Sequence, residues 1–131
     1  GKGLSVVRQM FLATISLEFH RHDPATLDTT AMVHRLRPKM TFIEELGDTH
    51  FQASFGHLND YSAIYYTYMW SLVISKDMWS AFESDPMNRE VATRYRTRVL
   101  QRGGGLDAKD QVSDFLGRDY DFDAWEAWLQ A

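Results

Sequence analysis

Apolar side chains recur at three- and four-residue spacings over residues 4–19, near the start of the chain. This spacing places them on one face, so it predicts a first helix. A second helix is expected through about residues 34–37, capped at its start by either Asp23 or Asp28. We expect Pro38 to end this helix, because the residue before a proline avoids the helical conformation.

Residues 40–56 show no clear helical period. The sequence Gly47-Asp48-Thr49 is typical of a turn. On either side of this turn, residues 41–43 and residues 50–53 are predicted to form short extended pieces.

The middle of the chain predicts two long helices. Residues 62–82 contain neither Pro nor Gly, and nearly all their side chains are large, so they are expected to form the central helix. The next helix is expected to start with Asp85 as its cap and Pro86 in its first helical position. It would run to about Gln101, where three consecutive glycines follow.

Two shorter helices are expected near the end of the chain. The first covers residues 106–116, with Asp107 as its cap and Gly117 placed to end it. The second begins at Asp121 or Asp123. A bundle of five or six helices with almost no strand predicts an all-α fold.

Length and charge narrow the class of protein. A chain of 131 residues fits one domain, so we predict a single helical domain over residues 1–131. Fourteen Lys and Arg against eighteen Asp and Glu give a net charge of −4, which disfavours nucleic acid as a partner. The uncharged stretch over residues 61–75 is shorter than the roughly 20 apolar residues of a membrane span, so a buried helix is expected there and no membrane partner.

The chain contains no cysteine, which excludes disulfides and thiolate metal ligands and fits a cytoplasmic location. It also lacks an H-E-x-x-H sequence, the two-histidine motif of zinc peptidases, so no metal site is predicted within it. No signal peptide is expected, because the start of the chain shows no basic segment followed by an apolar run.

Two charge clusters and four tryptophans complete the pattern. Both clusters are interpreted as solvated helix faces, or alternatively as a docking contact with each other or with a further part of the protein. Trp70 and Trp79 are expected inside the protein, whereas Trp125 and Trp128 would form an apolar face that needs covering. The basic cluster contains Arg89, Arg94, Arg96, Arg98 and Arg102, and the acidic cluster contains Asp119, Asp121, Asp123 and Glu126.

The segment richest in candidate chemistry covers residues 55–70. On the predicted helix, Tyr61, Tyr65 and Tyr68 are spaced i, i+4, i+7, which places three phenols on one face. His57 would precede them in a turn. Phenol O–H and imidazole N–H groups can stabilise a developing oxyanion. The same stripe is also typical of the packed side of a buried helix, and both interpretations stay open.

Two blocks of sequence are more specific than a helical pattern. The first comprises Phe55-Gly56-His57-Leu58, Tyr61-x-Ala63-x-Tyr65-Tyr66-x-Tyr68-x-Trp70-Ser71, Asp77-Met78 and Phe82. The second comprises Tyr95-Arg96, Leu100, Gly103-Gly104 and Phe115-Leu116-Gly117-Arg118. In this order and separation they resemble the C-terminal part of the zinc metallopeptidase family that includes thimet oligopeptidase, neurolysin, oligopeptidase A and dipeptidyl carboxypeptidase.

The resemblance implies an all-α protein that hydrolyses short peptides in a deep channel. In this family an H-E-x-x-H helix and a downstream Glu bind zinc, and these ligands lie upstream of the region that this chain resembles. The chain would therefore supply no zinc ligands, need the upstream zinc-binding part of the same protein as its partner, and be inactive alone. The alternative, from a different class, is a non-catalytic helical interaction module.

The resemblance also implies roles for four side chains. His57 matches a substrate-binding histidine, and Tyr68 matches the tyrosine that stabilises the transition-state oxyanion, so we expect both to be catalytic. Tyr61 and Tyr65 match tyrosines that contact the peptide. One difference is that Asn59-Asp60 replaces the family's Gly-Gly pair with a spacing one residue shorter, so the loop lacks the glycines that make it mobile in the family.

Overall fold

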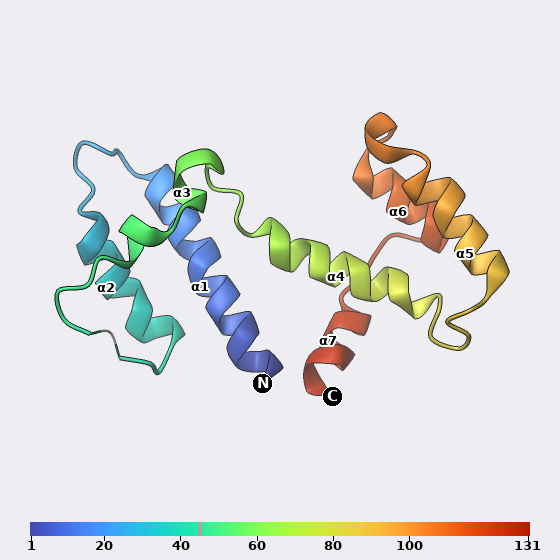
Figure 1. The fold of residues 1–131 in the computed structure, drawn as a ribbon, viewed down its shortest axis with the longest axis horizontal. Helices are drawn as coiled ribbons and strands as arrows, with labels where there is room; N and C mark the ends of the chain where they lie inside the picture. The colour runs from blue at the N-terminus through green and yellow to red at the C-terminus, as the bar shows by residue number, and fades with distance from the viewer. Residues whose placement is uncertain (45) are drawn as a thin grey trace. The chain divides into compact units, whose positions relative to one another are not determined.

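The computed structural model describes residues 1–44 and 46–131 (Figure 1). This part of the chain contains seven α-helices and no strand, which confirms the all-α prediction and is one helix more than the upper end of the expected five or six. None of the helices described is long and apolar enough to cross a membrane. The chain forms two compact units, Gly1–Met69 and Trp70–Ala131, and the single domain over residues 1–131 stays a prediction.

The first unit contains two long helices and two short helical turns. These are α1 (Lys2–Arg21), α2 (Thr29–Met40), the 3-10 turn η1 (Phe51–Ser54) and the short helix α3 (His57–Asp60). The predicted first helix is confirmed as α1, which packs against α2. The core of the unit comes mainly from α1, and burial of its apolar side chains stabilises the unit. The buried members are Phe11, Leu12, Ala13, Ile15, Val33, Phe55 and Tyr65.

The start of α2 is set by Asp28, one of the two predicted caps. Its carboxylate accepts a hydrogen bond from the backbone N–H of Ala31 at 2.9 Å, which is the geometry of an N-cap. Asp23 instead accepts a hydrogen bond from the N–H of Ala25 at 2.9 Å, in the turn before the helix.

The predicted end of this helix at Pro38 is wrong, because α2 continues to Met40. Leu36 and Met40, on either side of the proline, pack against the core of the first unit. This packing offsets the one backbone hydrogen bond that a proline in the last turn cannot donate.

The two predicted extended pieces are also wrong. Residues 41–43 lie outside any helix or strand, and residues 51–54 form η1. The ring centroid of Phe51 lies 6.0 Å from that of Phe11 and 5.6 Å from that of Phe55. A tight helical turn allows these ring contacts while pairing backbone groups within the segment, whereas an isolated extended piece would leave those groups without partners.

The second unit contains most of α4 (Thr67–Ser80) and all of the later helices. These are α5 (Arg89–Tyr95), the π-helical turn η2 (Arg96–Leu100), the 3-10 turn η3 (Gly103–Gly105), α6 (Ala108–Leu116) and α7 (Asp123–Gln130). Phe115 lies at the centre of its core, with the rings of Phe82 and Tyr95 at 6.1 and 5.5 Å between centroids.

Trp70 and Trp79 were expected inside the protein, but they are 44% and 50% exposed, so that prediction is wrong. The buried face of α4 is formed by Val73 and Asp77 instead. A large ring can pack one face on its neighbours and leave the other in solvent, as Trp70 does against Phe122 at 6.2 Å between centroids.

The helix predicted to start with Asp85 as its cap and Pro86 in its first position begins later in the structure. Asn88 caps α5, because its side chain accepts a hydrogen bond from the N–H of Val91 at 3.0 Å. Asp85 accepts from the N–H of Met87 at 3.1 Å, in the turn before the helix. The predicted end near Gln101 is confirmed, since η2 prolongs the helix to the preceding residue.

The ends of α6 are as predicted. Asp107 accepts a hydrogen bond from the N–H of Lys109 at 2.9 Å and caps the helix, and Gly117 ends it in the left-handed conformation with φ of 75°. Of the two predicted starts of the last helix, Asp123 is confirmed.

Replacing Gly117 by alanine is expected to lower the free energy of unfolding by about 1 kcal/mol, because this positive φ strains any residue with a Cβ atom. Gly104→Ala is the matched control, since Gly104 has no such φ. Neither position has an atom within 4 Å of the added Cβ, so the pair isolates backbone strain. Urea unfolding measures both variants, and equal stabilities would contradict the prediction.

Candidate functional site

The four side chains predicted to act on a peptide lie around the junction of α3 and α4, within the first unit. His57 is the first residue of α3, and Tyr61 directly follows that helix. Tyr65 lies in the turn before α4, and Tyr68 is the second residue of α4.

The common helix face predicted for the three tyrosines is wrong, because α4 begins at Thr67 and not near residue 62. In the preceding turn, Ala63 adopts a left-handed conformation with φ of 58°, which is uncommon for a residue other than glycine. A right-handed helix cannot continue through this conformation. The tyrosines are therefore brought together by a turn and not by helical spacing.

His57 and Tyr68 form a hydrogen-bonded pair. Nε2 of His57 lies 3.0 Å from Oη of Tyr68, and the two ring centroids are 5.8 Å apart. Tyr68 is 55% exposed. When the imidazole donates this bond, the phenol hydrogen is free for another acceptor, and when the phenol donates, Nδ1 of the imidazole carries the free N–H. The pair thus keeps one donor available in either arrangement.

Tyr65 is the buried member of the group, at 8% exposure. Its ring centroid lies 5.0 Å from that of His57 and 5.0 Å from that of Tyr68. Burial raises the pKa of the Tyr65 phenol and the nearby Tyr68 raises it further, whereas Arg8 and a hydrogen bond with the Gln9 side chain act in the opposite direction. The net pKa is raised, so this hydroxyl stays protonated at neutral pH.

Tyr61 is exposed and joins the group through His57, with 5.6 Å between the ring centroids. The structure therefore brings all four predicted residues into one cluster, with Tyr68 and Tyr61 exposed, His57 half-buried and Tyr65 in the core. Their roles in binding and catalysis stay predictions.

The described part of the chain does not fit a zinc ion. Within residues 1–44 and 46–131, no group of three or more His, Cys, Asp or Glu side chains is placed to hold a metal. A protein zinc site takes at least three such ligands. The chemistry that these residues offer is hydrogen-bond donation.

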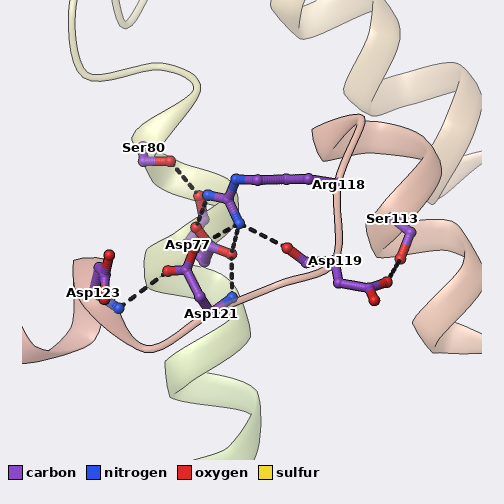
Figure 2. A network of polar contacts seen from close by, with 7 residues as sticks. All are labelled: Asp77, Ser80, Ser113, Arg118, Asp119, Asp121 and Asp123. Carbon is purple, nitrogen blue, oxygen red and sulfur yellow. Dashed lines mark hydrogen bonds and ion pairs between the residues drawn. The ribbon is translucent and has the colours of Figure 1, made fainter.

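A second polar cluster lies in the second unit, where it joins α4 to the link between α6 and α7 (Figure 2). The carboxylate of Asp77 is 1% exposed and accepts hydrogen bonds from Arg118 at 2.5 and 2.9 Å. The backbone N–H of Asp121 donates a third at 3.0 Å. Arg118 also donates to the backbone carbonyl of Asp119 at 2.8 Å and forms an ion pair with the carboxylate of Asp121. One guanidinium therefore contacts Asp77, Asp119 and Asp121.

Burial of Asp77 works to raise its pKa, but the hydrogen bonds from Arg118 and the Asp121 N–H, with the Arg118 charge, lower the pKa below its usual value. The pKa of Arg118 is raised, chiefly by its hydrogen bond to Asp77. Both groups are therefore ionised at neutral pH. The sequence assigned them no role, and their only signal was membership of the two motif blocks, one residue in each.

The basic and acidic clusters each form an ion pair with a residue that does not belong to the other cluster. Arg98 of the basic cluster forms an ion pair with Asp114 of α6 and donates to its carbonyl at 2.9 Å. Asp121 of the acidic cluster pairs with Arg118 at 3.0 Å. A docking contact between the two clusters stays a prediction.

The family of this chain follows from comparison with known proteins. Peptidase family M3 matches residues 1–131, and the chain therefore belongs to this family of metallopeptidases. The resemblance drawn from the two motif blocks is thereby confirmed at the level of the family.

Individual relatives carry two names. A mitochondrial intermediate peptidase of Leucoagaricus gongylophorus is 40% identical over 114 residues, and one of Pongo abelii is 33% identical over 109 residues. Each of these alignments covers 82% of this chain and 15% of the relative. Saccharolysin of Saccharomyces cerevisiae is 34% identical over 127 residues, covering 93% of this chain and 18% of that protein. The chain thus spans a small part of the length of these relatives. The comparisons do not test its cytoplasmic location, which stays a prediction.

Proposed function

We propose that this chain is the substrate-binding and oxyanion-stabilising part of a zinc-dependent peptidase that hydrolyses short peptides. Membership of peptidase family M3 supports the peptidase. The observation that carries the role of this part is the 3.0 Å hydrogen bond between His57 and the exposed Tyr68.

Peptide hydrolysis passes through a tetrahedral intermediate whose oxygen carries negative charge, and preorganised donors stabilise that charge. Tyr68 would donate its phenol hydrogen to this oxygen. His57 would hold the phenol oxygen in place by donating its Nε2–H to it. Because the pair is already formed before the charge develops, its stabilisation acts on the transition state.

The remaining parts of the site would come from elsewhere in the protein. The zinc ligands would lie in the upstream part, which we propose as the partner of this chain, and an H-E-x-x-H sequence is expected upstream in the same reading frame. Tyr61, exposed beside His57, would contact the peptide. Tyr65, at 8% exposure, would offer the peptide little of its side chain. The chain alone would bind no zinc and be inactive.

His57→Phe in the complete protein tests this proposal. Phenylalanine keeps a ring against Phe55 and Tyr65 but removes both ring nitrogens, so kcat/KM is expected to fall by roughly 10- to 100-fold. Steady-state cleavage of a short quenched peptide measures the change, and the zinc content should stay the same.

His22→Phe is the control, because His22 lies just after α1 and bonds only within that region, to the carbonyl of Glu18 at 2.8 Å. Unchanged kinetics in both variants would remove His57 from this role, whereas a complete protein that neither binds zinc nor cleaves the peptide would favour the non-catalytic helical interaction module.

A further inference from the structure

We propose that Tyr65 is a positioning residue that holds His57 and Tyr68 at hydrogen-bonding distance. This inference rests on the proposed function of the His57–Tyr68 pair. It gives Tyr65 a role different from the peptide contact that the family resemblance implies.

Three rings are in mutual contact at the site. The centroid of Tyr65 lies 5.0 Å from that of His57 and 5.0 Å from that of Tyr68, and the two partners are 5.8 Å apart. The planes of Tyr65 and His57 meet at 82°, an edge-to-face arrangement that aromatic rings favour. Because Tyr65 contacts both members of the pair, its position constrains the distance between them.

The core holds Tyr65 in place. It belongs to the buried cluster of the first unit, where its ring meets that of Phe55 at 5.1 Å and 73°. Side chains in a close-packed core occupy defined positions. The ring of Tyr65 is therefore a rigid support for Tyr68, which is half exposed and belongs to the first turn of α4.

The kinetic test separates positioning from peptide contact. In the complete protein, Tyr65→Leu is expected to lower kcat by about 10- to 100-fold with KM within about twofold, because small displacements of catalytic groups are costly. Tyr65→Phe keeps the ring and should retain kcat within about threefold. Phe11→Leu is the matched control: it disturbs the same core, against Phe51, and should lower stability without lowering kcat.

A second measurement is independent of activity. An aromatic ring shifts the NMR signals of protons near it, so in the histidine-labelled complete protein Tyr65→Leu is expected to move the ring signals of His57. Tyr66→Leu, at the exposed neighbouring position, should leave them in place.

Two results would overturn the positioning role. One is a rise of KM with kcat retained in Tyr65→Leu, which would assign Tyr65 to peptide contact. The other is an unchanged His57 signal in that variant. If Tyr68→Phe leaves kcat unchanged, the proposed function fails, whereas a shifted His57 signal in Tyr65→Leu would still show that the ring of Tyr65 lies against His57.

Discussion

Replacing Tyr68 by phenylalanine in the complete protein is expected to lower kcat by roughly 10²–10³-fold, with a much smaller change of KM. The substitution removes one oxygen from a side chain that is 55% exposed and leaves its ring contacts with His57 and Tyr65 in place. The hydroxyl would act on the oxyanion, which exists only near the transition state, so its loss should appear in kcat. Steady-state kinetics with a short quenched peptide measures both constants.

Tyr66→Phe is the matched control for this prediction. Tyr66 is exposed and lies two residues before Tyr68, so it loses the same group at a position outside the ring cluster. Its kcat is expected to stay unchanged, and both variants should unfold at the same urea concentration as the unchanged protein. A Tyr68→Phe enzyme with full kcat would remove Tyr68 from the oxyanion role.

Features that depend on a few neighbouring residues were predictable from the sequence. The apolar spacing over residues 4–19 gave α1, and Asp107 and Gly117 gave both ends of α6. In each case the signal and its structural consequence lie within one or two helical turns. Caps and glycine stops act through the adjacent backbone, which is why such predictions hold.

The start of α4 shows where local signals fail. Residues 62–66 contain neither Pro nor Gly and are compatible with a helix, yet the helix begins at Thr67 after a left-handed Ala63. The buried ring of Tyr65 belongs to the core of the first unit, and tertiary packing of this kind overrides helix propensity. The turn and not the helix places Tyr65 against His57 and Tyr68.

The same distinction applies to the site as a whole. The residue types and the motif named the four members of the cluster, but the geometry that joins them differs from the predicted helix face. Asp77 and Arg118, 41 positions apart, could not be predicted as a pair, because only the fold brings them together.

The pair of Asp77 and Arg118 leads to the second large expected effect, on stability. Arg118→Met leaves a buried carboxylate with the Asp121 N–H as its main remaining donor, which is unfavourable because an uncompensated charge is held out of water. The free energy of unfolding is expected to fall by about 2–4 kcal/mol at neutral pH, less than for a fully buried pair because Arg118 is partly exposed. Urea unfolding measures this loss.

Arg98→Met is the matched control, because both Arg98 and Asp114 are substantially exposed and such pairs contribute about 0–1 kcal/mol. A loss as large in the control as in Arg118→Met would show that burial of Asp77 is not the cause. The variant Asp77→Ala with Arg118→Met should lose less than the sum of its two single changes, since the charge is then removed together with its partner.

The pH dependence of the Arg118→Met effect has a definite sign. In the folded chain the pKa of Asp77 lies below its ordinary value, so the unfolded chain binds this proton first as the pH falls. The stabilisation is complete above the unfolded pKa of about 3.9 and is lost as the pH falls through the lower folded pKa. The difference between the unchanged chain and Arg118→Met should therefore be smaller at about pH 3 than at pH 7. A difference that stays constant would mean that packing of the Arg118 side chain, and not its charge on Asp77, stabilises the second unit.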